Sequence, residues 1–386
     1  MTNTKKTNIT LLLLFFGDAF VSPFLALNFI HLGFTNDQLA WLIAIKPICS
    51  VIGNFIYGHF SKDVKRDVFL MKIISVIFIA TLIGFAFAQS FEFCLILMII
   101  WSLHNSPMFS LSDGVADKFC ERDHKPYSIT RMFGSIGYFS CLIIGGIFGV
   151  TTGINYSVTF SIAAIVFVLL LVSLFFLKPF EMEQEVKEKI SYKSLIKDKR
   201  FIFYLFFYLF IIGVWKISDD YASEFFNTLG LSDGMWSFVY AGGVLVEVIA
   251  ILLINKFLNK NKDYVKLLVF SACTLTLRTV LFALPIDSVI LALITGILRG
   301  LGWGTFLASN MFIIEKMLGA SLVTKAVTVL TIEVNVFSSI GNYFYLSLRN
   351  CLGIPLLYSL LGGLQVLGIV FLIFIDYSFI KKENKT

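Results

Sequence analysis

Three side chains in the first half of the sequence have the types that bind polar ligands. Asp113 precedes Arg131 by eighteen residues, and Tyr138 follows Arg131 by seven. Seven residues are about two helical turns, so Tyr138 falls on the same helix face as Arg131, roughly 10 Å along the axis. A carboxylate, a planar guanidinium and an aromatic ring suit a ligand that carries hydroxyls and an apolar face. We predict a substrate site here, although such side chains also serve only to pack helices.

Other charged residues also lie inside apolar stretches, where charges are costly and are usually functional. The first half balances two acids with two bases. The second half has four acids and three bases, which leaves one surplus carboxyl. A buried carboxyl without a partner favours its protonated form, so we predict that the second half carries a proton. The further members of this charge network are Asp18, Lys46, Lys216, Asp219, Asp220, Glu247, Arg278, Arg299 and Glu333.

Glu247 is the predicted proton site, because it lies mid-span with no basic residue within four positions on either side. Arg278 or Arg299 is expected to approach it in one conformation and to drive proton release. Glu333 is the second candidate. It ranks below Glu247 because Lys216 on another helix is available to pair with it.

The composition determines which elements carry these residues. The 386 residues are 58% hydrophobic and 15% charged, with a mean hydropathy of +0.86. Soluble domains do not have this composition, and about 20 apolar residues are enough to span a membrane. The sequence therefore predicts an all-α membrane protein with twelve transmembrane helices. They cover about 8–30, 38–60, 69–88, 91–115, 128–150, 155–177, 201–224, 235–256, 264–284, 287–315, 321–347 and 352–379.

A hydrophilic stretch divides these helices into two groups of six. In residues 178–200, 12 of 23 residues are charged, which predicts a cytoplasmic linker between domains 1–177 and 201–386. With both termini cytoplasmic, almost all Lys and Arg outside the helices lie on the inner side, and only Arg349 lies outside. This is the positive-inside pattern, so the net charge of +6 reflects topology and not nucleic-acid binding.

Several motifs resemble the major facilitator superfamily. Pro23-Phe-Leu, Leu32-Gly-Phe-Thr and Gln38 look like the first two helices of its proton symporters for oligosaccharides, nucleosides and phenylpropionate. Gly58 occupies its place in the superfamily's cytoplasmic signature, and Arg131-Met-Phe-Gly resembles the lactose permease-like group. The resemblance implies two pseudo-symmetric six-helix bundles with a substrate site near the midplane between them.

The same resemblance assigns roles to individual residues. Asp113 falls on a substrate-binding carboxylate, Arg131 on its arginine partner and Tyr138 on a ring that stacks on the sugar. Asp219 falls on an acid of the group's charge network. The sequence departs from the group in the tenth predicted helix, where Arg299 falls near the coupling histidine.

These observations predict a proton-coupled symporter that imports a small hydroxylated solute, with a sugar or oligosaccharide favoured. A nucleoside or aromatic-acid symporter and a proton-coupled efflux antiporter are the alternatives. No HExxH, GxSxG or Walker motif is present, so neither an enzyme nor an ATP-driven pump is expected. The six scattered cysteines predict neither disulfides nor a metal site. We expect no cofactor, and a multi-pass monomer in the cell membrane whose partners are the substrate, protons and lipid.

Overall fold

A computed structural model gives the fold of the chain. It describes residues 3–61, 63–125, 127–152, 155–178, 195, 197–232, 234–261, 264–284 and 288–375. Most of the predicted linker 178–200 and the end of the last predicted span lie outside these residues. Within them the regular elements are all helices, as the sequence predicts. Ten of these helices are long and apolar enough to cross a membrane.

The chain divides into two compact units. The first contains Met1–Val186 together with Leu231–Ala241, and the second contains Lys187–Gly230 and Gly242–Thr386. The change from one unit to the other near Val186 lies in the charged stretch that separates the two groups of predicted helices. The short segment Leu231–Ala241, which the sequence places in the second domain, groups with the first unit.

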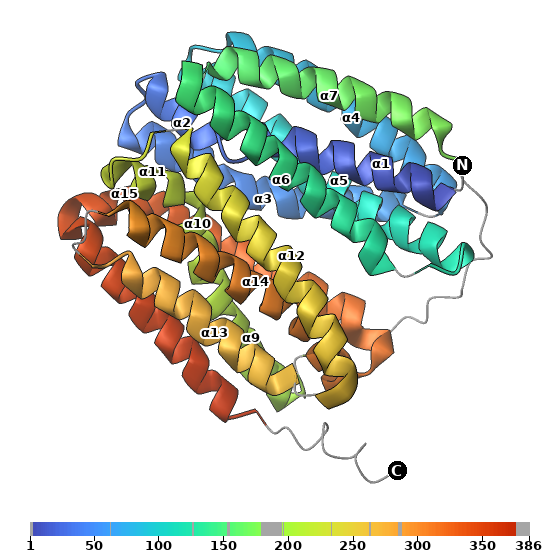
Figure 1. Cartoon of the computed structure of the whole chain (residues 1–386), viewed down its shortest axis with the longest axis vertical. Helices are drawn as coiled ribbons and strands as arrows, with labels where there is room; N and C mark the ends of the chain where they lie inside the picture. Colours follow the sequence, from blue (N-terminus) through green and yellow to red (C-terminus); the bar gives the residue numbers. More distant parts are fainter. Residues whose placement is uncertain are drawn as a thin grey trace. The chain divides into compact units, whose positions relative to one another are not determined.

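The first unit is a bundle of long helices. Helix α1 packs against α6 and α7, α3 packs against α5, and α4 packs against both α5 and α7 (Figure 1). The start of α3 has a capping box, in which Thr35 and Gln38 each bond the other's backbone N–H. The helices are α1 (Asn3–Ala19), α2 (Leu25–His31), α3 (Asn36–Phe60), α4 (Val64–Phe87), α5 (Phe91–Arg122), α6 (Tyr127–Thr152) and α7 (Tyr156–Phe176).

The first predicted span is interrupted, so the expectation of one continuous helix over 8–30 is wrong. Helix α1 ends at Ala19, and α2 begins at Leu25 after a stretch of turns. Pro23 explains the break, because its ring clashes with the carbonyl four residues earlier and it has no N–H to donate. Just before the proline, the Ser22 hydroxyl donates to the Asp18 carboxylate at 2.8 Å.

The second unit begins with a span built from four short pieces, in which α-helix changes to π-helix and back. Gln365 donates its side-chain N–H to the backbone carbonyl of Ile211, inside the π-helical piece, at 3.1 Å. Such π-helical turns frequently occur at functional sites. The pieces are α9 (Lys199–Tyr208), η1 (Leu209–Gly213), α10 (Val214–Asp220) and α11 (Ala222–Thr228).

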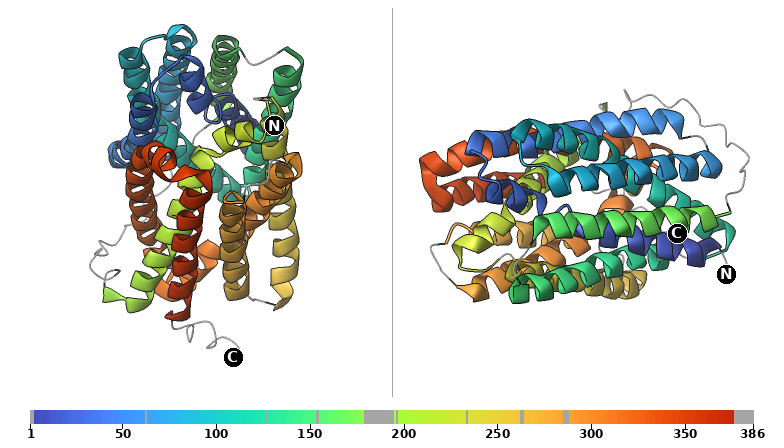
Figure 2. Two further views of the ribbon diagram at one scale, coloured as in Figure 1. Left: turned by 90° about the vertical axis from the view of Figure 1, so that its left-hand side faces the viewer. Right: turned by 90° about the horizontal axis from the view of Figure 1, so that it is seen from above.

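Four long helices follow, and α13 packs against both α14 and α15. Within each unit the long helices run side by side (Figure 2). The long helices are α12 (Met235–Asn261), whose first residues belong to the first unit, α13 (Tyr264–Leu281), α14 (Val289–Leu318) and α15 (Ala320–Ile373).

Helix α15 joins the last two predicted spans, which the sequence separates at 348–351. The two parts meet at Gly353, whose φ of 74° is non-helical and is easily adopted only by glycine. Pro355 follows it and begins the second part without needing a backbone donor. Because α15 counts once and α1 has only 17 residues, the described residues give ten spans, and the number twelve stays a prediction.

Glycines allow α12 and α14 to approach closely. A Cβ on Gly300 would collide with the carbonyl oxygen of Gly243, and one on Gly304 would lie 2.9 Å from the carbonyl oxygen of Glu247. The glycine-rich run 296–304 is therefore a packing surface. It fixes the backbone of Glu247 at the crossing of the two helices.

Candidate functional site

The ion pair that the eighteen-residue spacing predicts is present in the first unit. Arg131 Nε on α6 lies 3.4 Å from Asp113 Oδ1 on α5. The Tyr127 hydroxyl also bonds the Asp113 carboxylate, and the Arg131 guanidinium lies over the ring of Phe15 at 4.2 Å. Both members of the pair are half-exposed. The arginine is therefore oriented by two side chains, Asp113 and Phe15, and still has donors accessible to a ligand.

Tyr138 and Asp18 lie in the same unit with different surroundings. Tyr138 is half-buried on α6, about two turns beyond Arg131. Asp18 on α1 is buried and accepts hydrogen bonds from Ser22 and, at 2.9 Å, from Asn105 on α5. Its hydrogen bonds join α1 to α5.

In the second unit, Asp219 on α10 binds two arginines. Arg278 Nη2 lies 2.8 Å from its Oδ1, and Arg299 Nε lies 3.1 Å from the same oxygen. Arg278 is only 1% exposed and also donates to the Ser218 hydroxyl at 3.3 Å. The guanidinium of Arg299 lies over the indole of Trp215 at 5.9 Å. The two arginines that the sequence assigns to Glu247 are thus both held by Asp219.

A cavity of about 330 Å³ opens beside this cluster, wholly within the second unit. One wall is a pair of indoles, Trp215 on α10 and Trp303 on α14, stacked with centroids 4.3 Å apart and planes 14° from parallel. The indole N–H of Trp215 is buried without a partner among the described residues. The full lining is Tyr208, Ile212, Trp215, Lys216, Asp219, Asp220, Trp303, Thr331, Val334 and Asn335.

Two other charged side chains that line this cavity, Lys216 and Asp220, are hydrogen-bonded to asparagine side chains. Lys216 Nζ donates to the Asn335 side-chain carbonyl on α15. The Asn342 amide on the same helix donates to Asp220 at 2.8 Å. The cavity therefore combines an aromatic wall with fixed donors and acceptors, which suits a ligand that has hydroxyls and one flat face.

The two candidate proton sites differ in their surroundings. Glu247 is half-buried on α12 and takes part in an interaction, so it is not the isolated acid that the sequence suggests. Glu333 on α15 has a buried carboxylate oxygen, Oε2, without a hydrogen-bond partner among the described residues. The nearby Tyr208 lines the cavity. The surplus carboxyl of the second unit is thus better represented by Glu333.

Sequence reasoning missed the residues that depend on tertiary pairing. Trp215 and Trp303 are far apart in the chain, and the glycines beside Trp303 drew attention to packing alone. Tyr127 was also missed. An available signal was the presence of Trp215 next to Lys216, since ligand pockets combine aromatic side chains with a few polar or charged groups.

Comparisons with known proteins place the chain in a family. The model of the MFS_1 like family matches residues 6–344. No curated protein matches the sequence. The crystal structure of the nucleoside transporter NupG is similar with a TM-score of 0.79 at 17% identity, covering 97% of this chain and 99% of that one.

Two further solved structures show the same fold. A mutant of NupG gives a TM-score of 0.82 at 16% identity, covering 97% of this chain and 100% of the other. The D-xylose-proton symporter gives 0.72 at 16% identity, covering 97% and 98%. At these identities the likeness concerns the fold.

The family match covers most of the sequence and agrees with the apolar helices and two units. The chain therefore belongs to the MFS_1 like family and is a multi-pass membrane transporter of the major facilitator superfamily.

Proposed function

We propose that this transporter imports a small hydroxylated solute together with a proton, and that a sugar is the leading substrate class. The observation that carries the proposal is the cavity of the second unit, in which the stacked Trp215 and Trp303 lie beside Lys216 and Asn335. A sugar ring has one apolar face for an indole and hydroxyls for the charged and amide groups. The protein acts in the cell membrane as a monomer with both termini in the cytoplasm.

The Asp113–Arg131 pair is a second group of side chains suited to bind the solute, and it lies within the first unit. Arg131 presents a planar fork of donors to ligand hydroxyls, while Asp113 orients it and accepts from the ligand. Tyr138 offers a ring for the apolar face of the solute.

Proton coupling is assigned to Glu333 in place of Glu247. The support is the orphaned buried oxygen of Glu333, because an unpaired carboxylate is unfavourable in a low-dielectric surrounding and a bound proton removes its charge. Release requires the carboxyl to meet water or a base when the transporter changes conformation.

A nucleoside is the second candidate substrate. The aromatic wall of the cavity favours it, because a nucleobase offers a larger flat surface to aromatic side chains than a sugar does. NupG, a nucleoside transporter by its name, shares the fold.

Uptake into proteoliposomes tests the proposal. Purified protein would be reconstituted, and labelled D-xylose, lactose, uridine and phenylpropionate would be offered with and without an inside-alkaline pH gradient. Transient accumulation of a sugar that requires the gradient is the expected result. Accumulation of uridine alone would replace the sugar with the nucleoside, and efflux driven by proton entry would establish the antiporter.

A pair of tryptophan variants tests the cavity itself. Trp303→Leu should reduce uptake at least tenfold, because it removes one indole of the wall. Trp41→Leu is the matched control, since that residue lies on α3 and is mostly exposed. Equal uptake by the two variants would remove the cavity from the transport pathway.

A further inference from the structure

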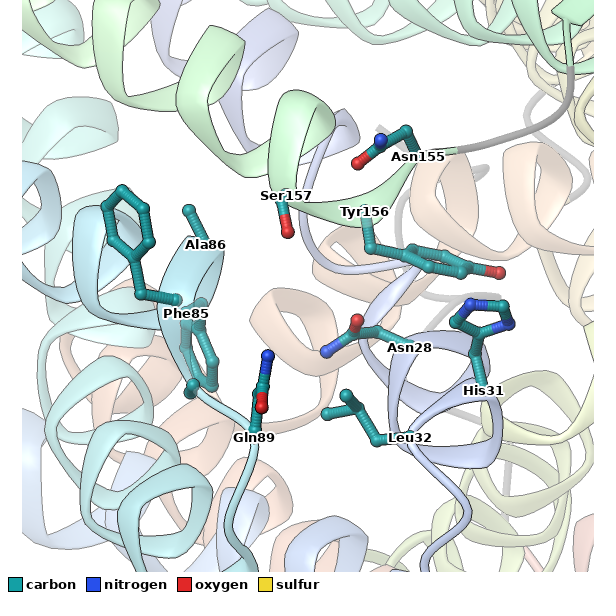
Figure 3. A pocket seen from close by; sticks show the side chains of 11 residues that line it. Asn28, His31, Leu32, Phe85, Ala86, Gln89, Asn155, Tyr156 and Ser157 are labelled. Carbon is teal, nitrogen blue, oxygen red and sulfur yellow. The ribbon is translucent and has the colours of Figure 1, made fainter.

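The first unit contains a cavity that the transport proposal does not use. Its volume is about 230 Å³, and it lies where three connections of the bundle meet. These are the end of α2, the turn between α4 and α5, and the start of α7 (Figure 3). A water molecule occupies about 30 Å³ in the liquid, so the cavity has room for a molecule of several heavy atoms. It is smaller than the sites that enclose drug-sized ligands.

A buried amide at this cavity has an unmade hydrogen bond. Asn28 on α2 is 5% exposed, and its Nδ2 has no acceptor among the described residues. The amide points into the cavity (Figure 3). Leaving a buried donor unsatisfied costs about 1–3 kcal/mol. A ligand oxygen in the cavity would provide the missing acceptor.

The other lining groups define the chemistry of that ligand. Gln89 and Ser157 border the same space with an amide and a hydroxyl (Figure 3). The rings of His31 and Tyr156 lie 5.6 Å apart on one side, and Phe85 adds an apolar surface. None of the described lining residues is Asp, Glu, Lys or Arg. Neutral amides and hydroxyls with apolar walls suit an uncharged molecule that carries several hydroxyls.

We propose that this cavity is a separate binding site for a neutral polyhydroxylated solute the size of a pentose. With the N-terminus in the cytoplasm, as proposed above, the end of α2 faces outside, so the site is open to external solute without transport. Asn28 donates to one ligand hydroxyl, while Gln89 and Ser157 bind others. The site shares no lining residue with the cavity of the second unit. Its existence therefore does not depend on the proposed transport function.

Hydrogen–deuterium exchange of the full-length protein in lipid nanodiscs, titrated with D-xylose, tests the site. The expected result is saturable protection at 25–32, 85–89 and 155–157. Asn28→Leu should weaken the apparent affinity at these segments at least tenfold. Gln89→Ala, a change of an exposed residue that leaves the buried packing intact, should weaken it several-fold.

The control is Ser161→Ala, a change of an exposed residue on α7 one turn beyond Ser157. It should bind like the wild type. Absence of protection at all three segments, or the same protection in Gln89→Ala as in the control, would overturn the proposal. The same experiment measures protection at α10, which would indicate binding of D-xylose in the cavity of the second unit. Protection at 25–32 without protection at α10 would therefore support this site while counting against D-xylose at the proposed transport cavity.

Discussion

The two units hold their intramembrane charges in different ways. In the first, one acid faces one base, and the side chains of Asp113 and Arg131 are 37% and 36% exposed. In the second, Asp219 is shared by Arg278 and Arg299, with side chains 16%, 1% and 12% exposed. The first arrangement is an open group with one ion-pair contact, and the second is a closed cluster with two.

This difference predicts different roles for the two groups. An exposed ion pair contributes little to stability, so its members exchange partners at low cost. A buried cluster is expensive to break, because any member left alone is an uncompensated charge in a low-dielectric interior. We infer that the open pair is suited to bind and release a ligand. The closed cluster is suited to hold α10, α13 and α14 in place around the second cavity.

The largest expected effect concerns the proton, for which we propose a site in the second unit. Glu333→Gln should abolish accumulation of substrate against its gradient while leaving counterflow largely intact. The reason is that an amide cannot carry the proton, whereas exchange needs no net proton movement. Uptake and counterflow in proteoliposomes measure both quantities.

Glu315→Gln is the matched control, because this residue lies exposed on α14 and loses the same charge. It should accumulate substrate like the wild type. Normal accumulation in Glu333→Gln would return Glu247 to first place, and Glu247→Gln would then be the variant to measure.

The next effect is on stability and tests the comparison directly. Asp219→Ala leaves Arg278 and Arg299 without their carboxylate, and we expect a loss on the order of 3–5 kcal/mol. Asp113→Ala should cost no more than about 1 kcal/mol, because its pair is half-exposed. Thermal unfolding in the same detergent measures both variants. Equal losses would show that the open and closed arrangements do not differ energetically.

The sequence predicted what depends on local pattern. Long apolar runs placed most helices within a few residues, and the spacing of Asp113 and Arg131 predicted their ion pair, because they lie on consecutive helices joined by a short turn. The break at Pro23 was missed because a hydropathy average over some 20 residues does not register a local loss of backbone hydrogen bonds.

The second site was harder to predict because its members come from distant helices. Counting acids against bases predicts that one carboxyl is in surplus, but it does not identify that carboxyl. The reason is that amide side chains also pair with charged groups. Asn335 binds Lys216 and Asn342 binds Asp220, and no count of charges includes them. Glu247 looked isolated only because neighbours along the chain are visible in a sequence and neighbours on other helices are not.

The third prediction tests whether the open pair contacts substrate. Arg131→Lys should weaken substrate binding by about 10- to 100-fold, which is about 1.4–2.7 kcal/mol. A lysine keeps the charge but cannot reproduce the planar fork of donors. Thermal stability should change little, because the pair is half-exposed. Equilibrium binding with the best substrate from the uptake panel measures the effect, and wild-type affinity would give the pair a purely structural role.

The smallest effect is expected at two acids outside the membrane spans, one in each unit. The hydroxyl of Thr4 bonds Asp123 and holds the pKa of that carboxyl below its ordinary value. Arg200 does the same for the pKa of Asp198, with Nη2 2.6 Å from Oδ2.

In both cases the folded-state pKa is lower than the unfolded one. The stabilisation is therefore fully present above about pH 4 and is lost as the pH falls through the folded pKa. For Asp198, which is partly open to solvent, the loss should stay under about 1 kcal/mol.

The two units should differ in how strongly this stabilisation depends on salt concentration. Screening weakens the Arg200 contact more than the neutral Thr4 hydrogen bond, so Asp198→Asn should matter mainly at low salt and Asp123→Asn at any salt. Thermal unfolding between pH 3 and pH 6 (about one unit either side of the ordinary Asp pKa), at low and high salt, measures both. The same salt dependence in the two variants would mean that Arg122, which also contacts Asp123, and not Thr4, dominates in the first unit.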